Sequence, residues 1–355
     1  MNNKQEIKAI IDKVIYKMEH MENSSNLLET CPISIIDIHD WEWSQGVGIY
    51  GLLKYYQETK DESILQFLID WYETNIIKGL PEKNVNTMCP MLTLSYIYEY
   101  TGEKKYLALC TEWVEWIMND MPKTEEKGLQ HIVSGEMNEQ QLWDDTLFMT
   151  VLFLARMGKL LDRRDYIHES IRQFLIHIKY LVDTQTNLLF HGWTFNGRHN
   201  FAKAKWARGN CWYTVGLPEY LEIVEDIDEG VKMYLLTNLE QQIVSLEKLQ
   251  NNNGMWHTIL DDSSSYQEAS ATAGFGYGIL KAVRCGYVDK KYKYIGEKAL
   301  EAVINRINDD GEVTEVSYGT GMGNTLDDYR EIPLCAMTYG QALAILLLTE
   351  GMKLE

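Results

Sequence analysis

The sequence is short of basic residues, of proline and of long apolar runs. Its 355 residues include 33 Lys and Arg against 52 Asp and Glu, which gives a formal net charge of -19. Nucleic acids and anionic membrane surfaces are bound by basic faces, so this composition argues against both as main partners. No stretch approaches the roughly 18 apolar residues that cross a membrane. The N-terminal residues lack an apolar signal region, and we therefore expect a cytoplasmic protein.

Cysteine pairs and metal-binding motifs are equally sparse. The six cysteines are scattered and form no CxxC pair, which is typical of reduced thiols in a protein core. No HExxH motif and no close group of His and Cys occurs, so we expect no catalytic metal and no cofactor. The glycine-rich segment 319–323 does not follow a predicted strand, and we interpret it as a loop against the pocket.

Helical periodicity runs through almost the whole chain. Only six prolines occur, and apolar residues recur at helical spacing, which predicts an all-α protein. The pattern repeats as an apolar helix, a short polar turn and a second, amphipathic helix. Such units lie near 52–74, 94–118, 143–182, 206–250, 267–306 and 336–355, and a helix near 4–21 completes the last.

The two helices of each unit differ in character. The first is small and apolar, whereas the second is longer and carries charge on one face. Two concentric rings require this difference, since an inner helix is buried all round and an outer helix has a face in water. We therefore predict an (α/α)6 barrel, a toroid of six helical hairpins, with residues 1–355 as its single domain. An open superhelix of helix pairs is the alternative.

The links that enter the inner helices carry residues that a purely structural protein has little reason to place there. Tryptophans gather with acids, amides and an arginine, in segments 41–46, 84–87, 143–146, 206–212 and 266–270. Flat aromatic faces beside hydrogen-bonding groups suit a carbohydrate ring. Ordinary core packing is the alternative for each single aromatic.

One stretch of the chain contains no acid. Residues 184–218 lack Asp and Glu, although these make up 52 of the 355 residues, and they include Arg198, Lys203, Lys205 and Arg208. Within an acidic protein this predicts a local positive site that attracts an anion. We expect a carboxylate on the ligand and not a phosphate, because no phosphate-binding loop accompanies the stretch.

Two adjacent acids, Asp144 and Asp145, precede an apolar helix. One interpretation is that they cap the helix and stabilise its unpaired N–H groups. The other is an acid at the mouth of the pocket, whose pKa rises in apolar surroundings so that it holds a proton to donate. Spacing alone leaves both interpretations open.

Seven segments carry a resemblance to a known family. They are WEWSQGV (41–47), LQHIVSG (129–135), LWDDTLFM (142–149), HGW (191–193), KWARGNCWY (205–213), SYQEASATAGFGYGI (265–279) and SYGTGMG (317–323). Together they resemble the unsaturated glycuronyl hydrolases, and most of all glycoside hydrolase family 105, the unsaturated rhamnogalacturonyl hydrolases. The resemblance implies an (α/α)6 barrel that acts on lyase products ending in a uronic acid with a C4=C5 double bond.

The resemblance also implies a mechanism and a set of residues. One Asp protonates C4 and assists water at C5, and the hemiketal then collapses to release the neighbouring sugar and a 5-keto-4-deoxyuronate. The catalytic Asp matches Asp145, and Arg208 is expected to contact the substrate carboxylate. The other expected substrate-binding residues are Trp43, Asn86, His131, Asp144, His191, Trp206 and Trp212. Related proteins often carry a second Asp where this chain has Asn86, which cannot titrate.

The expected ligand is an unsaturated uronic-acid disaccharide or short oligosaccharide, bound by a monomer or a homodimer. Two other functions stay open. One is a different (α/α)6 carbohydrate enzyme, either an ordinary glycosidase or a polysaccharide lyase. The other is a toroid that binds sugar without turnover.

Overall fold

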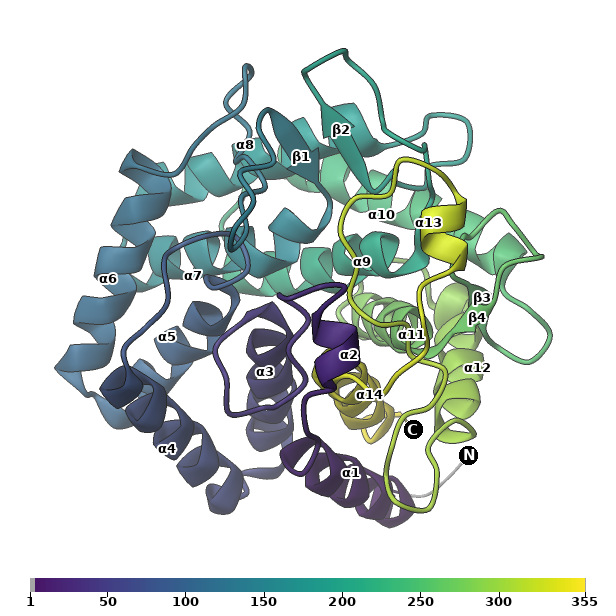
Figure 1. The fold of residues 1–355 in the computed structure, drawn as a ribbon, viewed down its shortest axis with the longest axis horizontal. Helices are drawn as coiled ribbons and strands as arrows, with labels where there is room; N and C mark the ends of the chain where they lie inside the picture. Colours follow the sequence, from purple (N-terminus) through teal and green to yellow (C-terminus); the bar gives the residue numbers. More distant parts are fainter. Residues whose placement is uncertain (1–3, 355) are drawn as a thin grey trace.

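The computed structural model of the chain describes residues 4–354, which form paired helices arranged in a ring (Figure 1). The elements in chain order are α1 (Lys4–Glu19), α2 (Ser25–Leu28), α3 (Trp43–Thr59), α4 (Glu62–Lys78), α5 (Cys89–Thr101), α6 (Lys104–Asn119), β1 (Gln141–Trp143), the π-helical turn η1 (Leu147–Val151), α7 (Leu152–Leu160), α8 (Arg164–Leu181), β2 (Gly192–Thr194), α9 (Ala207–Ile223), α10 (Glu229–Leu249), β3 (Trp256–His257), β4 (Gln267–Glu268), α11 (Ala269–Arg284), the 3-10 turn η2 (Lys290–Tyr292), α12 (Lys293–Ile304), α13 (Asp327–Arg330) and α14 (Thr338–Gly351).

Helices α3, α5, α7, α9, α11 and α14 form the inner ring, and α4, α6, α8, α10, α12 and α1 surround it (Figure 1). Burial follows this division. Every residue of α14 is buried, whereas α6 buries only one face, formed by Tyr106, Cys110, Trp113, Val114 and Ile117. The predicted all-α (α/α)6 barrel is confirmed, including the difference between apolar inner and amphipathic outer helices.

The inner helices approach one another closely. A Cβ atom at Gly278 of α11 would stand 2.2 Å from the carbonyl oxygen of Thr214 in α9, so only glycine fits at this contact. The ring closes between the two ends of the chain, where the Gln341 side chain of α14 donates to the carbonyl of Val14 in α1 at 3.2 Å.

A buried ion cluster joins three inner helices near their C-terminal ends. Glu219 of α9 accepts from Lys281 of α11 at 2.6 Å and from Lys54 of α3 at 3.2 Å. The Tyr50 hydroxyl donates to the same carboxylate at 2.6 Å. Burial alone would raise the pKa of Glu219, but the charges of Lys281 and Lys54 hold it well below its usual range. These ion pairs therefore stabilise the end of the barrel opposite the links that carry the sequence motifs.

Two short antiparallel strand pairs lie at the opposite end, before the inner helices begin. Strand β1 pairs with β2, with Trp143 opposite Gly192, and β3 pairs with β4, with Trp256 opposite Glu268. Helical periodicity could not predict strands this short. Within residues 4–354, no helix is both long and apolar enough to span a bilayer. The assignment of residues 1–355 to one domain stays a prediction.

Candidate active site

The N-terminal ends of the inner helices surround a small cavity. Six of the nine residues predicted from the sequence line it, namely Trp43, Asn86, His131, Asp145, Trp206 and Arg208. These residues come from four inner-helix entries and from the link between α6 and β1. The ring therefore brings together motifs that are far apart in the sequence, as the periodicity predicted.

Asp145 begins the helix that η1 continues, and it is the acid that reaches the cavity. Its carboxylate Oδ2 lies 3.2 Å from Nε2 of His191, and its side chain keeps 17% of its surface exposed. Burial alone would raise its pKa, but the hydrogen bond with His191 holds the pKa well below its usual range. Asp145 is therefore ionised in the free site.

Asp144 lies beneath Asp145 and has the opposite charge state. Its side chain is fully buried, and neither carboxylate oxygen has a hydrogen-bond partner among the described residues. Burial and the neighbouring charge of Asp145 raise its pKa well above the ordinary value, so it holds a proton at neutral pH. Asp144 makes no capping hydrogen bond among the described residues. Asp145 lies in the first turn of the helix that continues into η1, so for Asp145 the interpretation as a first-turn acid stays open.

Asp144 packs against bare backbone at the start of α9. A Cβ atom at Gly209 would stand 2.5 Å from its Oδ2, which explains why glycine follows Arg208 in this motif. The backbone N–H of Asp144 donates to the carbonyl of His191 at 3.1 Å. The β1–β2 pair thus places His191 beside both acids, although 46 residues separate it from Asp145.

His131 is neutral and forms one wall of the cavity. Its Nδ1 lies 2.8 Å from the Thr146 hydroxyl, and its ring stacks on Trp143 at 4.1 Å between centroids. Burial lowers its pKa to about 3, although the charge of Asp145 acts against this. His131 can therefore donate or accept a hydrogen bond, but it brings no charge to the cavity.

Arg208 supplies the positive charge. Its guanidinium donates to the carbonyls of Ser317 and Tyr318 at 3.1 Å each and to the Ser317 hydroxyl. The guanidinium carbon lies over the rings of Trp206, at 4.4 Å, and Tyr339, at 4.8 Å. Among the described residues it makes no direct ion pair, although the Ser317 hydroxyl that it contacts donates to the buried carboxylate of Glu268 at 3.4 Å, and its Nε has no hydrogen-bond partner. A buried, hydrogen-bonded cation without a direct ion pair is suited to bind an anionic ligand.

The other three predicted aromatics differ in their access to the cavity. Trp43 lines it and stacks on Tyr339 at 4.6 Å. Trp206 also lines it, and its indole N–H has no hydrogen-bond partner within residues 4–354. Trp212 is fully buried behind Trp43, at 6.3 Å between centroids. We therefore expect Trp212 to support Trp43 and not to contact a ligand directly.

Asn86 lines the cavity and contacts a buried acid that was not among the predicted residues. Its side-chain amide donates to Glu42 Oε1 at 3.4 Å, and Glu42 Oε2 caps α3 by accepting from the backbone of Trp43 at 3.0 Å. Burial raises the pKa of Glu42 to about 8. At neutral pH this carboxyl is largely protonated, so it adds little negative charge near the cavity.

The local positive site predicted from the acid-free stretch rests on one residue of that stretch. Arg198 pairs with Glu125 at 2.6 Å, and Lys205 pairs with Asp183 at 3.0 Å. Acids from other segments thus neutralise these cations, and Arg208 alone of the stretch's Lys and Arg residues lines the cavity. The predicted positive site is therefore a single buried guanidinium.

The sequence matches Glycosyl Hydrolase Family 88 over residues 10–355. The chain belongs to this family. The unsaturated rhamnogalacturonyl hydrolase YesR of Bacillus subtilis is 29% identical over 354 residues, covering 99% of this chain and 96% of that protein. An unsaturated 3S-rhamnoglycuronyl hydrolase of Alteromonas sp. is 23% identical over 328 residues, covering 87% and 76%. The solved structure of a Salmonella enterica protein, described as a possible member of the GH105 family, is 47% identical with a TM-score of 0.96, covering 99% and 95%.

The family 88 enzyme is thus a glycoside hydrolase, and the recognition of unsaturated glycuronyl hydrolases from its motifs is confirmed. Sequence reasoning missed several residues of its cavity. Trp143, Ser34 and Thr320 line the cavity, and Tyr329 contacts His191. The motif LWDDTLFM contained a signal for Trp143. Ser34 and Tyr329 lie outside every segment that carried the resemblance.

Three titratable side chains of the site lie close enough together to hold a cation. They are Asp144, Asp145 and His191, whose ligand atoms lie within 4.8 Å of one another. A cation there would require Asp144 to lose its proton and to present a carboxylate that is packed against Gly209. The raised pKa of Asp144, which burial and the charge of Asp145 cause, therefore fits a protonated acid better than a metal ligand.

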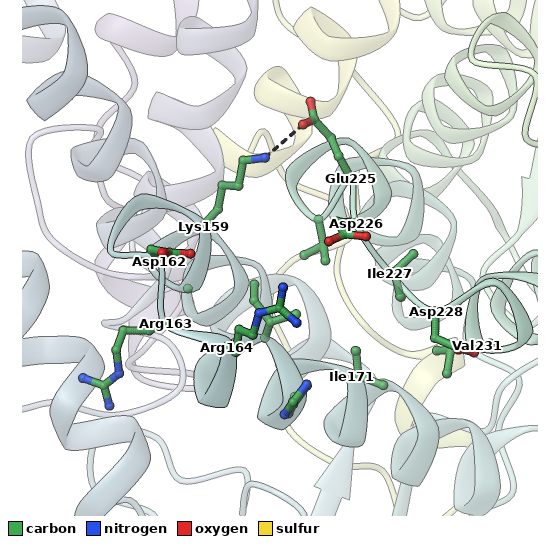
Figure 2. Close-up of a pocket in the computed structure, with 14 residues that line it drawn as sticks. Lys159, Asp162, Arg163, Arg164, Ile171, Glu225, Asp226, Ile227, Asp228 and Val231 are labelled. Carbon is green, nitrogen blue, oxygen red and sulfur yellow. Dashed lines mark hydrogen bonds and ion pairs between the residues drawn. The ribbon is translucent and has the colours of Figure 1, made fainter.

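The cavity of this family 88 enzyme is small in the described conformation. Its volume is about 30 Å³, far below the roughly 300–1,000 Å³ of typical ligand sites, so a sugar ring enters only if the rim opens. A larger cavity, of about 570 Å³, lies at the other end of the barrel, where Lys159 pairs with Glu225 (Figure 2). About 24 Å of α9 separates the two ends, and none of the nine predicted residues lines the larger cavity.

Proposed function

We propose that the enzyme hydrolyses unsaturated uronyl oligosaccharides, such as the unsaturated rhamnogalacturonan disaccharide, by hydration of the C4=C5 double bond. The observation that carries this proposal is the presence in a single cavity of one ionised acid, Asp145, and one buried cation, Arg208, that makes no direct ion pair among the described residues. A uronide has a carboxylate of its own, which can pair with the Arg208 guanidinium. Asp145 then remains available for proton transfer.

Asp145 is the group we assign to proton transfer. A proton from Asp145 adds to C4, and water adds to C5 while the carboxylate takes up one of its protons, so the catalyst is restored. The C5 hemiketal then opens to a ketone, and the hemiacetal left at C1 releases the neighbouring sugar. General acid–base assistance of this kind contributes roughly 10²–10⁴ in rate. No covalent intermediate is required, so the two-carboxylate separation rule of ordinary glycosidases does not apply.

The proton has to reach Asp145, which is ionised in the free site. Binding of the substrate explains why Asp145 takes up a proton. A carboxylate close to Asp145 is a like charge, and the sugar excludes water, and both raise the pKa of an acid. Asp144 keeps its proton because its pKa is raised, so it adds no second negative charge beside Asp145.

The remaining residues bind and orient the sugar. Trp43 and Trp206 offer aromatic faces at the cavity wall, and His131 offers a neutral ring nitrogen for hydroxyl groups. Asn86 can orient water or a hydroxyl but cannot transfer a proton. These roles are proposals, as are a cytoplasmic location and the choice between a monomer and a homodimer.

The test is the ultraviolet absorbance of the conjugated double bond, measured with a panel of lyase-generated disaccharides from rhamnogalacturonan, chondroitin and ulvan. The proposal predicts that the absorbance falls on addition of enzyme and that Asp145→Asn stops the fall. A polysaccharide lyase would create this absorbance, and an ordinary glycosidase would leave it unchanged. Thermal stabilisation by a disaccharide without any product would indicate a binding protein. If every disaccharide of the panel stays intact, the proposal is wrong.

A further inference from the structure

The segment between α12 and α14 covers the site and contributes a tyrosine that no motif indicated. Its short helix α13 lies on the near face of the ring in Figure 1, drawn in yellow. Tyr329 in this helix is 1% exposed, and its hydroxyl lies 2.7 Å from Nδ1 of His191. The two residues are 138 positions apart in the sequence.

The hydrogen bonds around this hydroxyl favour one direction. The backbone N–H of Gly323 donates to the Tyr329 oxygen at 3.1 Å, so the phenol has its own hydrogen free to donate. Nδ1 of His191 is the nearest acceptor, at 2.7 Å, whereas the weaker acceptor, the Met322 sulfur, lies at 3.5 Å. At the other side of the imidazole, Nε2 faces the ionised Asp145 at 3.2 Å. An ionised carboxylate only accepts, so Nε2 carries the hydrogen.

We propose that Tyr329 is a positioning residue that holds His191 as the neutral tautomer with its proton on Nε2, directed at Asp145. A second proton on His191 would have to sit on Nδ1, where the tyrosine hydroxyl already donates. Burial raises the pKa of Tyr329, which keeps the phenol a donor. The proposal rests on the proposed function only in taking Asp145 as the reacting acid.

The segment is held firmly enough for this role. Asp328 accepts from the backbone of Asn324 at 2.8 Å and of Thr325 at 2.9 Å. Arg330 pairs with Asp262 at 2.8 Å, and the Tyr266 hydroxyl donates to the Tyr329 carbonyl at 3.3 Å. The hydroxyl of Tyr329 is therefore fixed by contacts on both sides of the residue.

The first test determines the tautomer of His191 in the absence of substrate. Nitrogen-15 NMR of the imidazole, assigned by comparison with His191→Gln, reports which ring nitrogen carries hydrogen. We expect Nε2–H in the wild type at neutral pH, and a mixture with Nδ1–H or a doubly protonated ring in Tyr329→Phe. A wild-type ring with its proton on Nδ1 would overturn the proposal, even if the variant does not fold.

The second test measures kcat as a function of pH. The titratable groups facing the imidazole are Asp144 and Asp145 at the start of η1, His131 from the α6–β1 link and Tyr329. Without the hydroxyl, Nδ1 is free to take a proton. We therefore expect the acid limb of kcat to move to higher pH in Tyr329→Phe, and kcat to fall about 3- to 10-fold, as for one lost hydrogen bond, with KM nearly unchanged.

The matched control is Tyr294→Phe, which removes a hydroxyl bonded to Glu247 on the outside of α12. It should alter neither the tautomer nor the pH profile. An unchanged profile and tautomer in folded Tyr329→Phe would refute the positioning role. An enzyme inactive on every unsaturated disaccharide, but with the expected tautomer, would instead refute the proposed function alone.

Discussion

Exchanging each of the two adjacent acids for its amide tests the charge states derived for the site. Asp144→Asn replaces a buried acid that is already neutral, because burial and Asp145 raise its pKa. The change conserves shape and charge, and the lost carboxyl has no hydrogen-bond partner among the described residues. We expect kcat/KM to fall less than about 5-fold, as for a change worth about 1 kcal/mol. Asp145→Asn removes an ionised acid and should lower kcat by roughly 10²–10⁴.

The difference between the two variants is therefore about 2–5 kcal/mol of transition-state stabilisation. The assay is the initial loss of double-bond absorbance, with kcat and KM determined for each variant and thermal unfolding used to verify the fold. Asp226→Asn, an exposed acid beside the larger cavity at the far end of the barrel (Figure 2), is the control and should change neither constant.

Equal losses of kcat in both variants would refute this reasoning. The start of α9 lies against Asp144, and the partial positive charge of a helix N-terminus favours an ionised acid there. If that effect outweighed burial, Asp144 would be the charged group and its amide would be as damaging as that of Asp145. The two acids would then act as one coupled unit, without separate roles.

Three further substitutions test the binding cation, a buried acid and the far end of the barrel. Lysine cannot make the paired hydrogen bonds that the Arg208 guanidinium donates to the carbonyls of Ser317 and Tyr318. In Arg208→Lys we therefore expect kcat/KM to fall at least about 30-fold, as for a buried charge pair worth 2 kcal/mol or more. A loss below about 3-fold would contradict the role of Arg208. Glu42 has a pKa raised to about 8, so its own contribution to stability falls by about 1.4 kcal/mol per pH unit between roughly pH 4.5 and 8. Glu42→Gln should change the pH dependence of stability by that amount, which urea unfolding of both proteins at pH 5 and 7.5 would measure, and parallel profiles would refute the raised pKa. Glu219→Gln leaves Lys281 and Lys54 with only the half-exposed Glu222 as an ion-pair partner, so we expect a loss of about 3 kcal/mol in urea unfolding, the lower end for a broken buried pair, with KM unchanged.

The sequence predicted the ring and most of the residues that line its cavity. This was possible because the inner helices are apolar and the links before them carry the motifs, so helical periodicity alone aligns the motifs at one end. Trp43, Asn86 and Arg208 meet in the cavity for this reason. Trp212 belongs to the same motif as Arg208, but it lies one turn further along α9 and packs behind Trp43.

Charge states and tertiary hydrogen bonds could not be predicted in the same way. Asp144 and Asp145 are adjacent, and only the packing of Asp144 on Gly209 decides which of them is buried and protonated. Likewise, His191 reaches Asp145 through a strand pair too short to leave a periodic signal. Tyr329 lies in a four-residue helix within an irregular segment, where the sequence offers no pattern that places it near His191.

The distribution of charge explains how a protein with a net charge of -19 can accept an anion. At neutral pH, burial keeps Asp144, Glu42 and His131 uncharged, so the cavity contains one negative group, Asp145, and one positive group, Arg208. Charges elsewhere on the surface are screened over about 8 Å at physiological ionic strength. The proposed uronide would therefore meet a site with no net charge, in which the cation makes no direct ion pair. The same burial that makes Asp144 and Glu42 poor anions would thus allow an acidic protein to bind the acidic sugar that we propose as its substrate.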